Sequence, residues 1–81
     1  MKYLLFTTTT CPNCPALKEF VAENISFGGE VLDDSSPNFG ERIREAGVQN
    51  APTLIVFDDE GAEVFRGGEV SEVADFLGGP G

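Results

Sequence analysis

At 81 residues, the chain is too short for two independently folded units, and we expect one domain over residues 1–77 with a flexible tail over residues 78–81. Its 14 acidic and 5 basic side chains give a formal net charge of −9, which opposes binding to nucleic acids and to anionic membranes. The apolar run at residues 3–6 is too short for a signal peptide or a membrane span, so we expect a cytoplasmic protein, and we expect it to be a monomer.

The first part of the chain predicts a strand, a helix and a second strand. Residues 2–7 are apolar and aromatic, which favours a buried strand. From Pro12 to about Asn24, apolar residues recur at helical spacing. Residues 25–33 again favour a strand, and the pair Gly28-Gly29 predicts a bulge or bend within it. The two strands should therefore be parallel and joined by a right-handed helical crossover.

The remaining residues predict a short helix, a hairpin and a last helix. The short helix is capped by Ser36 or Asn38, has Pro37 in its first turn and ends at about Ala46. The strands of the hairpin cover residues 53–57 and 62–66. The last helix follows Gly67-Gly68 and includes Val70, Val73, Ala74 and Leu77. The predicted order is β-α-β-α-β-β-α. It describes an α/β fold in which helices cover both faces of a four-stranded mixed sheet.

The two cysteines carry the clearest chemistry in the chain. Cys11 follows the first strand and opens the helix, where unpaired N–H groups and the helix dipole favour a thiolate. The pKa of the Cys11 thiol should therefore lie below that of a free cysteine, and we expect Cys11 to attack disulfides. Cys14 stands one helical turn further and is expected to resolve the mixed disulfide, which closes a redox-active Cys11–Cys14 bridge. This mechanism needs no metal and no other cofactor.

Three short motifs together resemble the thioredoxin superfamily. They are the run Thr10-Cys11-Pro12-Asn13-Cys14-Pro15, the triplet Ala51-Pro52-Thr53 before a strand, and Gly67-Gly68 before the last helix. The chain is most similar to small glutaredoxin-like thioredoxins, some of which donate electrons to ribonucleotide reductase, and here the active-site motif reads Cys-Pro-Asn-Cys. The resemblance implies a thioredoxin-like fold and a thiol–disulfide oxidoreductase, an electron carrier that reduces protein disulfides, with ribonucleotide reductase as one candidate target.

The resemblance also implies which residues bind the substrate. In this superfamily the proline before the third strand is cis and lies against the active-site disulfide, and the backbone of the preceding residue pairs with the substrate. Pro52 and Ala51 hold these two places. The expected substrate-binding residues are therefore Pro12, Asn13, Ala51, Pro52, Thr53, Gly67 and Gly68.

The glutathione-binding pattern of glutaredoxins is incomplete in this chain. Glutaredoxins usually carry a lysine three residues before the first cysteine and a tyrosine between the cysteines, where this chain has Thr8 and Asn13. The acids at Glu69 and Glu72 stand where the glutathione carboxylate would approach, and like charges repel. We therefore expect a flavoprotein of the thioredoxin-reductase type as the electron source rather than glutathione.

Two other functions use the same residues and stay open. A structural zinc ion needs about four ligands, and because the chain has two cysteines and no histidine, a metal or cluster site would require a dimer. Alternatively, the chain is an adaptor that binds partners by β-strand addition near Pro52, with redox chemistry incidental.

Overall fold

The structure is a computed structural model that describes residues 1–8, 12 and 14–78. Its sheet has four strands in the order β2-β1-β3-β4, which are β1 (Lys2–Phe6), β2 (Gly29–Leu32), β3 (Thr53–Phe57) and β4 (Glu63–Gly67). Strands β1 and β2 are parallel, and β3 is antiparallel to both of its neighbours. The predicted order of elements and the parallel pairing of the first two strands are confirmed.

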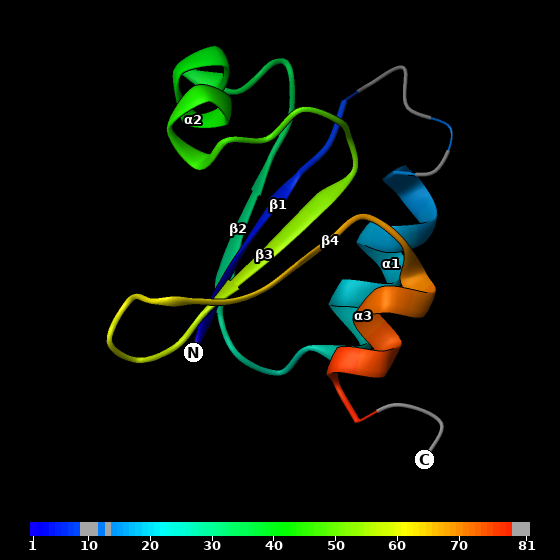
Figure 1. Ribbon diagram of the computed structural model, residues 1–81. Helices are drawn as coiled ribbons and strands as arrows, with labels where there is room; N and C mark the ends of the chain where they lie inside the picture. The colour runs from blue at the N-terminus through cyan, green and yellow to red at the C-terminus, as the bar shows by residue number, and fades with distance from the viewer. Residues whose placement is uncertain (9–11, 13, 79–81) are drawn as a thin grey trace.

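Three helices cover the sheet, α1 (Cys14–Asn24), α2 (Phe39–Ala46) and α3 (Val70–Phe76). Figure 1 shows α1 and α3 side by side on one face of the sheet and α2 on the opposite face. The predicted coverage of both faces is therefore confirmed. Within the described part of the chain, none of the helices combines the length and apolarity needed to cross a membrane.

Two apolar clusters fill the space between the sheet and its helices. The cluster beneath α1 and α3 contains Leu5, Leu17, Val21, Ile25, Leu54, Val56 and Val73, and the cluster beneath α2 contains Phe6, Leu32, Val48 and Ile55. Successive side chains of a strand point to opposite faces, so a strand covered on both faces has an uninterrupted apolar sequence. This explains why Leu54, Ile55 and Val56 are all 0% exposed.

Some predicted bounds are wrong by one residue: β1 ends at Phe6 and not at residue 7, β4 covers Glu63–Gly67 and not residues 62–66, and α3 ends at Phe76, before Leu77. Three further expectations need a larger correction. The helix α1 begins at Cys14 and not at Pro12, which lies in a bend. The second strand covers only Gly29–Leu32, so the glycine pair stands at its start and not at a bend inside it. A Cβ atom on Gly29 would collide with the Tyr3 side chain of the paired strand, which explains the glycine there.

The third correction concerns the entry to α2. Pro37 lies outside the helix, because the residue that caps its N-terminus is Asn38. Asn38 adopts a left-handed backbone conformation with φ 60°, and its side chain makes no capping hydrogen bond. The end of the helix is as expected, since Gly47 has φ 70° and its N–H bonds the carbonyls of the last turn.

Candidate functional site

The start of α1 holds one of the two expected catalytic residues. Cys14 is the first residue of the helix and only 3% exposed, whereas Pro12 just before it is exposed. Cys11 and Asn13 lie outside the described residues.

The segment that enters β3 has the backbone geometry that the sequence predicts. The peptide bond between Ala51 and Pro52 is cis, and Pro52 is buried. Thr53 follows as the first residue of β3, and its hydroxyl donates a hydrogen bond to the carbonyl of Asn50. The cis form at Pro52 is therefore confirmed, whereas the binding of a substrate to this segment stays a prediction.

A groove brings together five of the expected substrate-binding residues. It has a volume of about 390 Å³, and its lining includes Ala51, Pro52, Thr53, Gly67 and Gly68. The backbone of Gly68 passes so close to Pro52 that a Cβ atom on Gly68 would lie 2.5 Å from the Pro52 carbonyl oxygen. No side chain fits between the two segments, so a glycine is required at this position.

A second hollow shares Gly68 and Glu69 with this groove and borders α1. It has a volume of about 260 Å³ and is lined by Ala16 and Leu17 from α1 and by the segment 68–70. Gly68 therefore borders both the groove at Pro52 and the hollow beside the first turns of α1. In Figure 1 the segment between β4 and α3 passes next to the first turns of α1.

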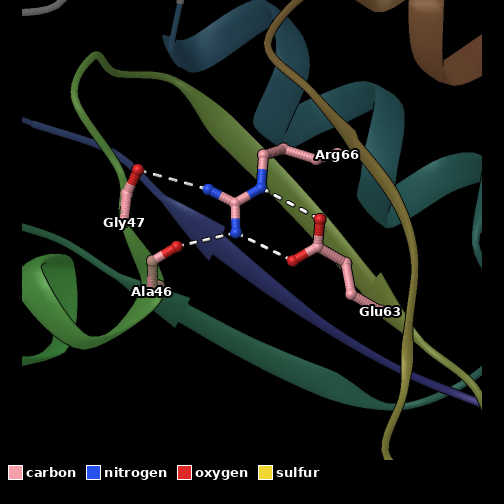
Figure 2. A network of polar contacts seen from close by, with 4 residues as sticks. All are labelled: Ala46, Gly47, Glu63 and Arg66. Carbon is pink, nitrogen blue, oxygen red and sulfur yellow. Dashed lines mark hydrogen bonds and ion pairs between the residues drawn. The ribbon is translucent and has the colours of Figure 1, made fainter.

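Arg66, which lines the groove, is the centre of a network of polar contacts that no sequence motif predicted. The Arg66 guanidinium donates to both carboxylate oxygens of Glu63, from Nε at 3.1 Å and from Nη2 at 2.8 Å. It also donates to the carbonyl oxygens of Ala46, at 2.6 Å, and Gly47, at 3.3 Å (Figure 2). Nothing in the residue spacing links β4 to the end of α2, so periodicity alone gives no signal for this contact.

The ion pair shifts the pKa values of both partners. Its hydrogen bonds raise the pKa of Arg66 and lower the pKa of Glu63. Four of the five N–H donors of the guanidinium are thus engaged, by one carboxylate and two carbonyls. The two other charged side chains on the groove, Glu69 and Glu72, are exposed acids, and Glu72 accepts a hydrogen bond from the Gly68 N–H at 3.3 Å. Apart from the Glu63–Arg66 pair, the charge along the described groove is therefore negative.

The lowered pKa of Glu63 predicts a pH-dependent contribution to stability. Its carboxylate stabilises the fold above the ordinary pKa range of a glutamate, and this contribution is lost as the pH falls from about 4 through the lowered folded-state pKa. We therefore expect the free energy of unfolding of Glu63→Gln to fall less than that of wild type between about pH 7 and about pH 3. Urea unfolding measures both slopes, with Glu60→Gln in an exposed turn as control. Equal slopes for wild type and Glu63→Gln would contradict the assignment.

Metal ligands do not gather in the described part of the structure. Among residues 1–8, 12 and 14–78, no group of three or more His, Cys, Asp or Glu side chains is arranged to hold a metal ion. Because Cys11 lies outside these residues, this observation does not bear on the metal-bridged dimer.

Comparisons with known proteins find two curated relatives, both glutaredoxin-like proteins. No family model matches it. The glutaredoxin-like protein NrdH of Lactococcus lactis subsp. cremoris (strain MG1363) is 29% identical over 70 residues, which cover 86% of this chain and 96% of that protein. The NrdH protein of Lactococcus lactis subsp. lactis (strain IL1403) matches with the same identity and the same coverage.

Solved structures of thioredoxins share the fold. Thioredoxin O2 from Arabidopsis thaliana, in the oxidised state, superposes with a TM-score of 0.76 at 18% identity and covers 94% of this chain and 70% of its own. Thioredoxin 1 from Thermosipho africanus TCF52B gives a TM-score of 0.68 at 21% identity, with coverages of 95% and 86%. The thioredoxin-like fold that the sequence predicts is therefore confirmed.

Proposed function

We propose that the chain is a thiol–disulfide oxidoreductase that reduces protein disulfides, with Cys11 as the attacking thiolate and Cys14 as the resolving thiol; its thioredoxin-like fold and its similarity to glutaredoxin-like proteins support this proposal. The observation that carries this proposal is the closeness of Gly68 both to Pro52 and to the first turns of α1, where Cys14 is buried. The proposed peptide-binding groove thus shares Gly68 and Glu69 with a hollow that borders the helix carrying the second thiol.

The proposed reaction is two successive thiol–disulfide exchanges. The Cys11 thiolate attacks one sulfur of the substrate disulfide, forms a mixed disulfide with it and releases the other sulfur as a thiolate. Cys14 then loses its proton and attacks the Cys11 sulfur, which releases the second substrate thiolate and forms the Cys11–Cys14 disulfide. The substrate gains two electrons and the protein loses two. The burial of Cys14 supports the division of roles, because a 3% exposed thiol is poorly accessible to a substrate from solution.

The groove beside Pro52 is the proposed binding place of the substrate backbone. The segment Ala51-Pro52-Thr53 runs into β3, and an extended peptide that pairs with Ala51 would lie along the groove toward Gly67 and Gly68. Pro12 and Asn13 complete the proposed contact surface from the cysteine motif.

We propose a flavoprotein of the thioredoxin-reductase type as the electron donor, in preference to glutathione. Glutathione carries carboxylates, and the groove is lined by the acidic side chains of Glu69 and Glu72, which would repel them. The one cation that lines the groove among the described residues, Arg66, is already bound by Glu63. Ribonucleotide reductase is one candidate target, as in the small glutaredoxin-like thioredoxins that the chain resembles.

A charge reversal at Glu69 tests the choice of electron donor. Glu69 is exposed and makes no side-chain capping bond, so Glu69→Lys should fold normally. We expect the rate of insulin reduction supported by glutathione, glutathione reductase and NADPH to rise about threefold to tenfold. The substitution removes one repulsive charge and adds one attractive charge, and each exposed charge contact contributes at most about 1 kcal/mol. The rate with thioredoxin reductase and NADPH should change by less than about twofold.

The matched control is Glu60→Lys, which makes the same charge change in an exposed turn away from the groove. Equal glutathione-dependent rates in the two variants would show that groove charge does not decide the donor. A wild-type chain that already works faster with glutathione than with the flavoprotein would contradict the proposed donor directly.

The same coupled assay tests the proposed function itself. With wild-type chain, thioredoxin reductase and NADPH, insulin disulfides should be reduced and NADPH consumed in equal amounts. If neither electron source supports insulin reduction, the proposal is wrong.

A further inference from the structure

Helix α2 is weakly anchored to the rest of the molecule by its apolar side chains. It contains no buried residue, and its half-buried Phe39, Ile43 and Ala46 pack against the cluster around Phe6 and Ile55. Apolar burial contributes in proportion to the area removed from water, so this helix gains less from packing than α1, which buries three residues. Polar contacts at its ends therefore have a larger share in fixing its position.

The Arg66 side chain joins the end of this helix to the edge strand β4. Its guanidinium binds the carbonyl oxygens of Ala46 and Gly47, which belong to the C-terminal end of α2 (Figure 2). A cation at this end also interacts favourably with the helix dipole. The carboxylate of Glu63 accepts two hydrogen bonds from the guanidinium in a bidentate contact, which orients the remaining N–H donors of Arg66.

The segment between this contact and β3 is short. Only residues 48–52 separate Gly47 from Thr53, and Val48 is held in the apolar cluster beneath α2. On its far side, Pro52 is in close contact with the backbone of Gly68. Residues 66–68, at the end of β4 and just after it, therefore contact both ends of the segment that carries Ala51 and Pro52. Arg66 contacts Gly47 at one end, and Gly68 contacts Pro52 at the other.

We propose that Arg66 is a positioning residue for substrate binding, which fixes the end of α2 and thereby the backbone at Ala51 and Pro52. This inference rests on the proposed function, since it assumes that protein disulfides bind along that backbone. The proposed role of Arg66 involves no contact with the reacting sulfurs. Its loss should weaken the binding of a peptide backbone and leave thiol chemistry intact.

The test compares two disulfides in steady-state kinetics of Arg66→Met with thioredoxin reductase and NADPH. For insulin, we expect KM to rise about fivefold, as the loss of a net hydrogen-bonding contribution implies, with kcat changed by less than about twofold. For 5,5′-dithiobis(2-nitrobenzoate), which has no backbone to pair, KM should change by less than about twofold. A general loosening of the fold would not separate the two substrates.

Two further variants make the result specific. Glu63→Gln keeps the guanidinium but weakens its grip, so it should raise the insulin KM less than Arg66→Met, and the double variant should resemble Arg66→Met alone because both residues act as one unit. The control is Arg42→Met, which removes the 3.6 Å ion pair between α2 and Glu30 of β2, at the opposite edge of the sheet from β4. It should leave both KM values unchanged.

The outcomes separate this inference from the function on which it rests. An insulin KM for Arg66→Met equal to that of Arg42→Met, or equal losses with both disulfides, would overturn the positioning role while leaving the oxidoreductase intact. If Arg66→Met does not fold, additive effects of Glu63→Gln and Arg42→Met on the insulin KM would overturn it, and an effect of Glu63→Gln alone would support it. A wild-type chain inactive toward both disulfides would overturn the proposed function.

Discussion

The Cys11→Ser variant is expected to lose turnover with protein disulfides by more than about a thousandfold, because a serine hydroxyl cannot replace the attacking thiolate. The Cys14→Ser variant keeps the attacking residue but cannot resolve the mixed disulfide. It should therefore accumulate covalent complexes with its substrate. Non-reducing gel electrophoresis and intact-mass spectrometry after incubation with an oxidised protein measure both effects.

The double variant Cys11→Ser/Cys14→Ser serves as the control and should form no complexes. Complexes that form with Cys11→Ser and not with Cys14→Ser would reverse the two roles. Full partner-dependent activity in the Cys11→Ser variant would favour the adaptor over the oxidoreductase, since an adaptor does not need the thiolate.

The Gly68→Ala variant is expected to have the second largest effect. Its new Cβ atom would lie 2.5 Å from the Pro52 carbonyl oxygen, which belongs to the backbone and cannot rotate away. Because Gly68 is not among the residues with positive φ, the cost comes from this collision and not from backbone strain. We expect a loss of about 1–3 kcal/mol in the free energy of unfolding, as for overpacked sites, and about a tenfold loss in kcat/KM toward insulin as Pro52 is displaced.

The matched control for this prediction is Gly40→Ala. Gly40 lies in α2, and a Cβ atom there would meet nothing within 4 Å. Because alanine favours a helix over glycine, Gly40→Ala should stabilise the fold by up to about 1 kcal/mol and leave insulin reduction unchanged. Urea unfolding and the coupled assay compare the two variants. Equal stability and equal kcat/KM would show that Gly68 is not needed as a glycine.

The elements with buried apolar faces were predictable from the sequence alone. The run Thr53 to Phe57 predicted β3 with correct bounds, because a strand covered on both faces has an uninterrupted apolar sequence. The repeat of Leu17 and Val21 likewise predicted α1 and its end at Asn24.

Element starts were less predictable, since they depend on single contacts between segments. The glycine pair at positions 28 and 29 was expected to form a bulge or bend inside a strand. A glycine is needed at position 29, however, because a Cβ atom there would collide with the Tyr3 ring on the neighbouring strand. Similarly, Pro37 favoured a first helical turn by its fixed φ, whereas the left-handed Asn38 delays the helix by a further residue. Neither contact leaves a periodic pattern.

The candidate site was predictable only in part. The resemblance to a known superfamily named both Pro52 and Gly68 as substrate-binding residues, but their mutual contact was not predicted, because the two residues are separated by a whole hairpin and no local rule connects them. The contact of Arg66 with Ala46 and Gly47 depends on a side chain that reaches from β4 to a helix end. Such long-range contacts require the folded backbone to be known.

A single-turnover reaction tests the central claim most directly. Fully reduced chain, free of added reductant, is mixed with an equal amount of a protein that carries one disulfide, and both products are analysed by thiol titration, intact mass and peptide mapping. We predict that the two thiols of the chain disappear as the substrate gains two thiols, and that the oxidised product is a monomer with Cys11 linked to Cys14. Unchanged thiols in both proteins, or thiols held by stoichiometric zinc or iron in a dimer, would contradict it.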